Sequence, residues 1–283
     1  MKRNLDEGLG TVYERFMLNN LFDELLATYP IHNVLEVPIY GMSGLTGINS
    51  LHFAKKGCRV TLVDKDQNWL LEAQELWKMA DLKDQCQPIY QKDLSRLPFK
   101  ENSFDLVWNF AALWFVEQAE SLLRDMIRVS SNLVLIAVPN PGQPGYFLRK
   151  YCIDPDFFKQ VDEKWVRKDR ICRVLASENL QIIRQGILDI PPWPDTCVPI
   201  KHILQKFGIR LKENPSTGSP EGGWTWNIMD YYLGRNPGLK EKVERFSFLE
   251  KSPLPYFFKA LWAHHHYILG KKPSYKRALT VRL

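Results

Sequence analysis

The stretch VLEVPIYGMSGLTG, residues 34–47, joins a short apolar run to a turn that contains three glycines. The run ends on the acid Glu36, and Gly41, Gly44 and Gly47 follow at three-residue intervals. Glycine allows positive φ angles and a close approach of the backbone to a ligand, and a following helix N-terminus offers unpaired N–H groups. The stretch therefore predicts a strand that runs into a cofactor-binding loop.

Strands and helices alternate on both sides of this stretch. Strands are predicted at 31–37, 59–64, 87–93, 104–110, 133–138 and 180–190, and helices at 11–28, 48–56, 67–80, 118–130 and 156–178. Short strands that alternate with helices favour an α/β protein with a doubly wound, mostly parallel sheet. The strand at 133–138 is apolar throughout, which is typical of a strand covered on both faces.

The C-terminal part of the chain breaks this alternation. Residues 191–255 show no clear strand-helix unit and contain the polar stretch NPSTGSPEGG at 214–223, whereas 257–272 predicts a last strand. We therefore predict one domain formed by 1–190 and 256–283. The 191–255 segment is predicted to be an insertion or lid over the substrate side, although its aromatic residues would equally suit a small core of its own.

Composition places the chain among soluble globular proteins. Of its 283 residues, 45% are hydrophobic and 25% are charged, and the sequence shows no long apolar run and no secretory signal. The five cysteines are odd in number and form no Cys-x-x-Cys motif, so reduced thiols are expected. We predict a cytoplasmic protein.

The charge is distributed unevenly along the chain. Residues 1–140 hold 14 Lys+Arg and 18 Asp+Glu, whereas 141–283 hold 24 and 14, which gives net charges of −4 and +10. The basic half, with the amphipathic stretch KHILQKFGIRLK at 201–212, suggests peripheral contact with an anionic membrane or another polyanion. A solvated basic surface without a partner fits the same charges. Nucleic acid is not expected, because no RNA-binding domain is recognisable.

Three features follow the first three predicted strands in order. They are the glycine-containing turn, Asp64 at the end of the second strand, and Asp93 just past the third. Ligands of such sheets bind outside the carboxyl ends of the strands. A carboxylate at Asp64 could accept both hydrogen bonds of a ribose diol, and Asp93 could meet an adenine amino group. Each feature alone also fits a tight connection or a helix cap, and Asp66 competes for the capping role. Together they predict a nucleoside-containing cofactor.

These segments resemble the class I S-adenosylmethionine (SAM) dependent methyltransferases, of the type 11 kind. The resemblance rests on VLEVPIYGMSGLTG, RVTLVDKD, QKDLSRLPFKENSFDLVWNFAALWFV and LVLIAVPN, of which LPFKENSFDLV is the most specific. The ending HHHYILGKKP is similar to the antiparallel seventh strand of the family. The resemblance implies a Rossmann-like, seven-stranded sheet with an antiparallel last strand, an insertion between strands six and seven, and SAM as cofactor.

The resemblance implies roles for four residues of the first motif. Glu36 would orient the loop or the methionine ammonium group, and Gly41 and Gly44 would let the backbone pass the methionine and ribose. Tyr40 would contact the cofactor or the acceptor. The family usually carries glycines where this chain has Pro38 and Tyr40, and the segment is about five residues longer than usual, so we interpret the loop as enlarged.

Five further positions carry over from the later motifs. Asp64 would bind the ribose hydroxyls, and Lys65 would lie beside the adenine. Asp93 and Leu94 would contact the adenine amino group and ring. Asn109, at the end of the fourth strand, would face the methionine moiety or the substrate.

The resemblance implies methyl transfer to a small-molecule acceptor, and the aromatic insertion suggests an apolar or lipid-like one. A nearby base would help if the acceptor is a hydroxyl, and His202, His264 and His266 are weak candidates for it. Within a strand, His264 and His266 would share one face. No metal site is expected, because the histidine pair lacks a third ligand.

Two other functions stay open. The altered loop at 38–40 fits a non-catalytic binding or regulatory protein with the methyltransferase fold. The acid after the second strand fits a nicotinamide-dependent oxidoreductase, but a GxGxxG motif is absent and Asp93 would have no role.

Overall fold

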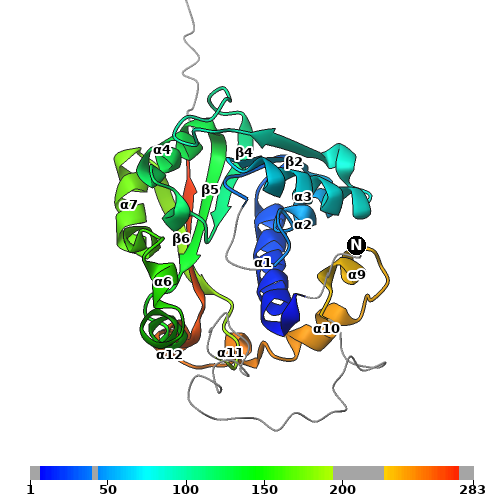
Figure 1. The fold of residues 1–283 in the computed structure, drawn as a ribbon, viewed down its shortest axis with the longest axis vertical. Helices are drawn as coiled ribbons and strands as arrows, with labels where there is room; N and C mark the ends of the chain where they lie inside the picture. Colours follow the sequence, from blue (N-terminus) through cyan, green and yellow to red (C-terminus); the bar gives the residue numbers. More distant parts are fainter. Residues whose placement is uncertain (1–6, 40–43, 194–225, 274–283) are drawn as a thin grey trace, which may run out of the picture.

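The computed structural model describes residues 7–39, 44–193 and 226–273 as an α/β fold around one sheet (Figure 1). The predicted site residues Tyr40, Gly41 and His202 lie outside these ranges, as do the stretches 201–212 and 214–223.

The sheet has seven strands in the order β3-β2-β1-β4-β5-β7-β6. The pairs among β1 to β5 are parallel, and β7 runs antiparallel to both β5 and β6. This topology confirms the predicted mostly parallel sheet with an antiparallel last strand. The strands are β1 (Asn33–Glu36), β2 (Arg59–Asp64), β3 (Cys86–Tyr90), β4 (Phe104–Phe110), β5 (Ser130–Pro139), β6 (Gln181–Leu188) and β7 (His265–Lys271).

Helices cover both faces of the sheet. Because side chains alternate along a strand, Val34 belongs to the core under one helical layer and Leu35 to the core under the other. The first layer contains α1 (Gly8–Thr28), α2 (Leu51–Lys55) and α3 (Gln67–Met79), and the second contains α4 (Ala119–Val129) and α7 (Lys168–Ser177). Asp66 caps α3 as predicted, since its carboxylate accepts a hydrogen bond from the Asn68 N–H at 2.8 Å.

Helix α1 is buried on more than one face. Its outer side is covered by the segment that carries α9 (Ile228–Tyr232), α10 (Leu239–Glu244) and α11 (Phe248–Lys251). Phe16 packs edge-on against Tyr231 with ring centroids 5.0 Å apart, and the Asn19 side chain donates to the Tyr232 hydroxyl at 2.9 Å. The described part of the predicted insertion therefore packs on the N-terminal helix.

Two predicted elements are wrong in detail. The run 257–272 is not one strand, because α12 (Tyr256–Trp262) precedes the shorter β7. A run of mostly apolar residues fits either state, and Pro255 sets the start of the helix here. The predicted helix at 156–178 is divided into α6 (Pro155–Phe158), the 3-10 turn η4 (Glu163–Val166) and α7.

The division near 162 has a visible cause. The Asp162 N–H donates to the Trp114 carbonyl at 2.9 Å, and its carboxylate accepts from the Lys164 N–H at 3.1 Å, so the chain restarts there. The remaining short elements are the 3-10 turns η1 (Lys83–Gln85) and η2 (Leu113–Phe115), α5 (Pro144–Leu148) and the π-helical turn η3 (Arg149–Ile153).

Candidate functional site

The carboxyl ends of the parallel strands meet at one edge of the sheet. The strand order reverses between β1 and β4, and α/β sheets of this kind bind ligands outside that point. Glu36 ends β1, Asp64 ends β2, and Asn109 stands one residue before the end of β4. The predicted site residues of the described chain therefore gather along this edge.

A pocket of about 330 Å³ opens at this edge. It brings together Lys65 after β2, Asp93 and Leu94 after β3, and residues 116–118 after η2. The full lining is Lys65, Lys92, Asp93, Leu94, Ser95, Val116, Glu117 and Gln118. Three residues predicted to surround one ligand group thus converge from two separate segments of the chain.

The chemistry of this pocket suits a flat base that carries an amino group. Leu94 and Val116 are apolar walls, whereas the Asp93 carboxylate is exposed. Asp93 accepts a hydrogen bond from the Ser95 N–H at 2.9 Å. Hydrogen bonding by the Ser95 side chain, followed by that of its backbone N–H, lowers the pKa of Asp93 below its ordinary value. Asp93 is therefore an ionised acceptor at neutral pH.

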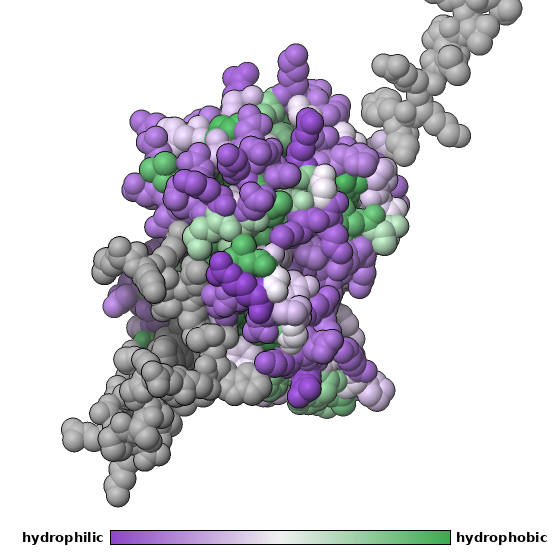
Figure 2. All heavy atoms as spheres, turned by 90° about the vertical axis from the view of Figure 1, so that its right-hand side faces the viewer, coloured by the Kyte–Doolittle hydropathy of each residue, from purple (hydrophilic) through white to green (hydrophobic). Residues whose placement is uncertain are grey.

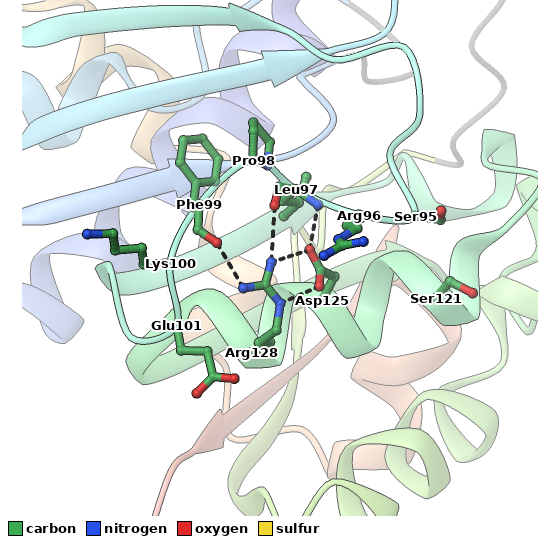
Figure 3. Close-up of a pocket in the computed structure, with 10 residues that line it drawn as sticks. All are labelled: Ser95, Arg96, Leu97, Pro98, Phe99, Lys100, Glu101, Ser121, Asp125 and Arg128. Carbon is green, nitrogen blue, oxygen red and sulfur yellow. Dashed lines mark hydrogen bonds and ion pairs between the residues drawn. The ribbon is translucent and has the colours of Figure 1, made fainter.

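A second pocket of about 870 Å³ lies against the same loop on the α4 side (Figure 3). Its central cation is already engaged: Arg128 pairs with Asp125 and donates to the carbonyls of Phe99 at 2.8 Å and Leu97 at 3.1 Å. Asp125 also accepts from the Leu97 N–H at 2.5 Å. These contacts fix the LPFKENSFDLV motif to α4, which makes the motif a support for the Asp93 turn.

Glu36 is fully buried and turned toward the α1 and α2 layer. Its carboxylate accepts hydrogen bonds from the Asn49 amide at 3.1 Å and the Ser50 hydroxyl at 2.6 Å. The Ser50 oxygen in turn accepts from the Trp108 indole at 2.9 Å. Burial raises the pKa of Glu36 to about 7, against the opposing effect of these hydrogen bonds and of Arg15. In this arrangement Glu36 holds the start of α2.

Asp64 and Asn109 are also buried, and both join strand ends. The Asp64 carboxylate accepts from the N–H groups of Ile39 at 3.2 Å and Asp66 at 2.9 Å. The Asn109 amide donates to the Val37 carbonyl at 2.8 Å. The two side chains thus tie the chain after β1 to β2 on one side and to β4 on the other. Their predicted contacts with ribose and methionine stay predictions.

Gly44 lies against α1. Its φ is +83°, and a Cβ atom there would stand 2.2 Å from Glu7 Oε1 and 2.5 Å from an Arg15 nitrogen. Glu7 Oε1 also accepts from the Leu45 N–H at 2.8 Å and pairs with Arg15 at 3.5 Å. Glycine at 44 is therefore favoured both by its positive φ and by its packing against α1, and the sequence spacing did not reveal the packing.

The candidate histidines lie where β6 and β7 meet the same edge. His264 precedes β7, and its Nδ1 lies 2.8 Å from Asp189 Oδ2. His265 packs on Phe110 with ring centroids 4.7 Å apart. His266 is on β7 itself, where burial, followed by the charge of Lys168, lowers the pKa of His266 to about 4. His266 is therefore neutral at physiological pH.

Glu14, Asp189 and His265 form a buried cluster that the sequence did not single out. Each offers an atom within 4.8 Å of the others, and His265 Nδ1 lies 3.7 Å from Glu14 Oε2. The three come from α1, the turn after β6 and the start of β7. No spacing in the sequence relates them, and only the fold brings them together. Such a set can exchange a proton or hold a cation.

Comparison with known families identifies this arrangement. A family model described as a methyltransferase domain matches residues 42–135, which include Lys65, Asp93 and Leu94. The chain carries a class I SAM-dependent methyltransferase domain. The matched segment runs from the loop after β1 to β5, so it contains the described pocket and the motif that supports it. No match is found among curated protein sequences.

Solved structures share the fold of this methyltransferase over most of its length. A Galdieria sulphuraria protein described as a sarcosine dimethylglycine methyltransferase aligns with a TM-score of 0.52 at 15% identity, covering 91% of this chain and 84% of that one. A geranyl diphosphate methyltransferase in complex with SAM gives 0.50 at 13%, with 92% and 85% covered. The [4+2]-cyclase SpnF gives 0.52 at 15%, with 91% and 80% covered. At these identities the likeness concerns the fold alone.

Proposed function

We propose that this methyltransferase transfers the methyl group of SAM to a small-molecule acceptor of apolar or lipid-like character. The observation that supports it most is the convergence of Lys65, Asp93 and Leu94 on one pocket at the carboxyl edge. A cytoplasmic setting belongs to the proposal and is supported by the free thiols of the four described cysteines, Cys58, Cys86, Cys152 and Cys172.

The residues present fit the adenosine part of the cofactor. Leu94 and Val116 would contact the faces of the adenine, and Asp93 would accept a hydrogen bond from its amino group. The stem of Lys65 would cover the ring edge. When bound, SAM supplies an activated methyl group on its sulfonium. The chain itself has to bind, orient and exclude water, because an in-line displacement depends mainly on alignment.

A proton acceptor for a protic substrate would lie at the β6–β7 end of the edge. Asp189 engages Nδ1 of His264, so the imidazole would accept a proton at Nε2. We assign this role to His264 in place of His266, because burial lowers the pKa of His266 to about 4 and makes its imidazole a weak proton acceptor. The Phe110 and His265 rings pack together, buried, at this end, and an aromatic environment of this kind suits an apolar acceptor. The related fold of a geranyl diphosphate methyltransferase supports the same class.

Calorimetric binding of S-adenosylhomocysteine tests the cofactor assignment. Asp93→Ala is expected to weaken binding about tenfold, since it removes a charged acceptor. Asp84→Ala is the matched control, because Asp84 is exposed and precedes β3, at the opposite edge. If Asp93→Ala and Asp84→Ala bind S-adenosylhomocysteine with equal affinity, the adenine lies elsewhere. If the wild-type protein does not bind it, the proposal is overturned.

One observation favours the non-catalytic alternative. Glu36 and Asp64, which the family resemblance assigns to the cofactor, are both occupied by protein hydrogen bonds. SpnF, named as a cyclase, shows that this fold serves more than one chemistry. Transfer of a labelled methyl group from SAM into an extract of small molecules and lipids discriminates the two, because a binding protein would transfer none.

A further inference from the structure

Large hydrophobic side chains are exposed in one part of the described structure far more than elsewhere. Eleven such residues are exposed in the described ranges, and eight of them belong to 147–151 and 248–261. We call this the aromatic surface. Its members are Phe147, Tyr151, Phe248, Leu254, Tyr256, Phe257, Phe258 and Leu261. The other three, Leu71, Met79 and Tyr90, lie on α3 and β3.

Helix α12 is the centre of the aromatic surface. Its sequence is YFFKALW, yet none of its residues is buried, and Phe257 and Phe258 are 60% and 52% exposed. The two rings contact each other, with centroids 4.3 Å apart. Helices in soluble proteins are stabilised mainly by burying an apolar face. A seven-residue apolar helix without such a face indicates that another apolar medium covers it.

The two segments of the surface are joined by a structural anchor. The Asn140 amide, in the turn before α5, donates to the carbonyls of Ala260 at 2.6 Å and Ala263 at 2.9 Å. Phe147 and Tyr151 stack on the α5 side, with centroids 6.4 Å apart. Figure 1 places α11 and α12 at the lower end of the molecule, whereas the face turned toward the viewer in Figure 2 is largely hydrophilic, with scattered hydrophobic residues.

The aromatic surface borders the edge of the sheet that carries the site. Helix α12 ends at Trp262, three residues before His265, which pairs with Pro139 at the end of β5. The Asn140 N–H donates to the His264 carbonyl at 2.8 Å. An acceptor that arrived through this surface would therefore reach the Asp189 and His264 end of the edge.

The charges of the surface suit an anionic medium. Its two ranges contain Arg149, Lys150, Lys251 and Lys259 but only one acid, Glu250. That acid is turned inward, where it contacts the Tyr13 hydroxyl and accepts from the Ile190 N–H at 2.7 Å. Arg149 and Lys150 pair with acids of the following turns. Lys259 donates to the Glu250 carbonyl at 2.7 Å, a neutral partner, so Lys251 and Lys259 give the surface around α12 its positive charge.

We propose that the aromatic surface docks this protein on a lipid bilayer as a peripheral membrane protein. Exposed phenylalanine, tyrosine and leucine side chains next to lysines are the composition of interfacial membrane anchors. None of the helices in the described ranges has the length and apolar character to cross a bilayer, so the contact would be superficial. The acceptor would then be a membrane-resident lipid-like molecule, a statement that rests on the proposed function, whereas docking does not.

Flotation with lipid vesicles, without SAM, tests docking. The wild-type protein is expected to float with vesicles of phosphatidylcholine and phosphatidylglycerol at 3:1. The double variant Phe257→Ser/Phe258→Ser is expected to bind at least tenfold more weakly, because both rings leave the apolar phase. Leu71→Ser/Met79→Ser is the matched control, because both side chains are exposed on α3, and it is expected to bind within twofold of wild type.

Two further measurements keep the outcomes distinct. Lys251→Glu/Lys259→Glu is expected to weaken binding at least fivefold on the mixed vesicles and little on pure phosphatidylcholine. The variant Phe257→Ser/Phe258→Ser should bind S-adenosylhomocysteine as tightly as the wild-type protein does. Failure of docking and failure of the cofactor site can therefore be told apart. Docking is overturned if the wild type floats with neither vesicle, or if the serine variant floats as well as wild type. A wild-type dimer that the serine variant converts to monomers, without flotation, would show a chain–chain interface instead.

Discussion

The two halves of the carboxyl edge use the same residue types differently. On the β2–β3 side, Lys65, Asp93 and Leu94 line an open pocket. On the β1–β4 side, Glu36 and Asn109 are fully buried and hydrogen-bonded to the protein itself. Acids along this edge thus divide into groups that face the open pocket and groups that hold the edge in place. The distinction follows from exposure, because a buried carboxylate must find its donors within the protein.

The comparison is tested most strongly by Asp64→Ala. The change leaves the Ile39 and Asp66 N–H groups without their acceptor, and we expect it to lower the free energy of unfolding by about 4 kcal/mol. Urea denaturation measures this, with Asp64→Asn as the conservative variant that keeps one acceptor. A loss below about 1 kcal/mol, at the level of a surface substitution, would show that Asp64 is free to serve the ligand.

The second test uses the pH dependence that Glu36 contributes. Because burial raises the pKa of Glu36 from 4.5 to about 7, the native state retains a proton that the unfolded chain releases between these values. The contribution of Glu36 to the free energy of unfolding should therefore fall by about 3 kcal/mol as pH rises through this window.

Glu36→Gln isolates this effect. The lowered pKa of His266 acts in the opposite direction, since that stability is lost as pH falls below 6.5. Removing the Glu36 titration should therefore make stability rise more steeply from pH 4.5 to 7 than in wild type. Denaturation curves at pH 5 and 8 give the change in the free energy of unfolding with pH for the wild type and for Glu36→Gln. An equal change in the two proteins would contradict the assignment.

The third test compares two glycines with positive φ. Gly57 has φ of +90° and no neighbouring atom of the described chain within 4 Å of an added Cβ, whereas Gly44 meets Glu7 and Arg15. Gly57→Ala should cost about 1 kcal/mol for backbone strain alone. Gly44→Ala should cost about 2 kcal/mol more, in the range of overpacked sites. Equal losses in thermal or urea unfolding would show that the turn does not pack on α1.

The smallest expected effect concerns the open side. Lys65→Ala should weaken binding of S-adenosylhomocysteine about threefold, or about 0.7 kcal/mol, because an apolar stem is lost from the ring edge. Stability should be unchanged, since the side chain is exposed. Lys100→Ala is the control, because Lys100 lines the second pocket. A larger loss of affinity in Lys100→Ala than in Lys65→Ala would indicate that the adenine binds in the second pocket.

Strands in the centre of the sheet could be predicted closely, and irregular segments could not. The predicted strands 59–64 and 104–110 have the observed bounds of β2 and β4, and the apolar run of β2 lies between the polar residues Arg59 and Asp64. The run that contains α12 and β7 has no such internal boundary, so its period could not separate helix from strand. The convergence of Lys65 and Asp93 followed from the rule that parallel strands share a carboxyl edge.

The sequence by itself determined the alternation of strands and helices up to β5, the antiparallel last strand through a family resemblance, and the residues Lys65, Asp93 and Leu94 of the open pocket. These properties depend on local periodicity and on motifs within about 100 residues. Only the tertiary structure decided that Gly44 serves α1, that Glu36 is protonated more readily than an ordinary acid, and that Glu14, Asp189 and His265 meet. Each of these depends on contacts and desolvation between distant segments, and no local pattern encodes them.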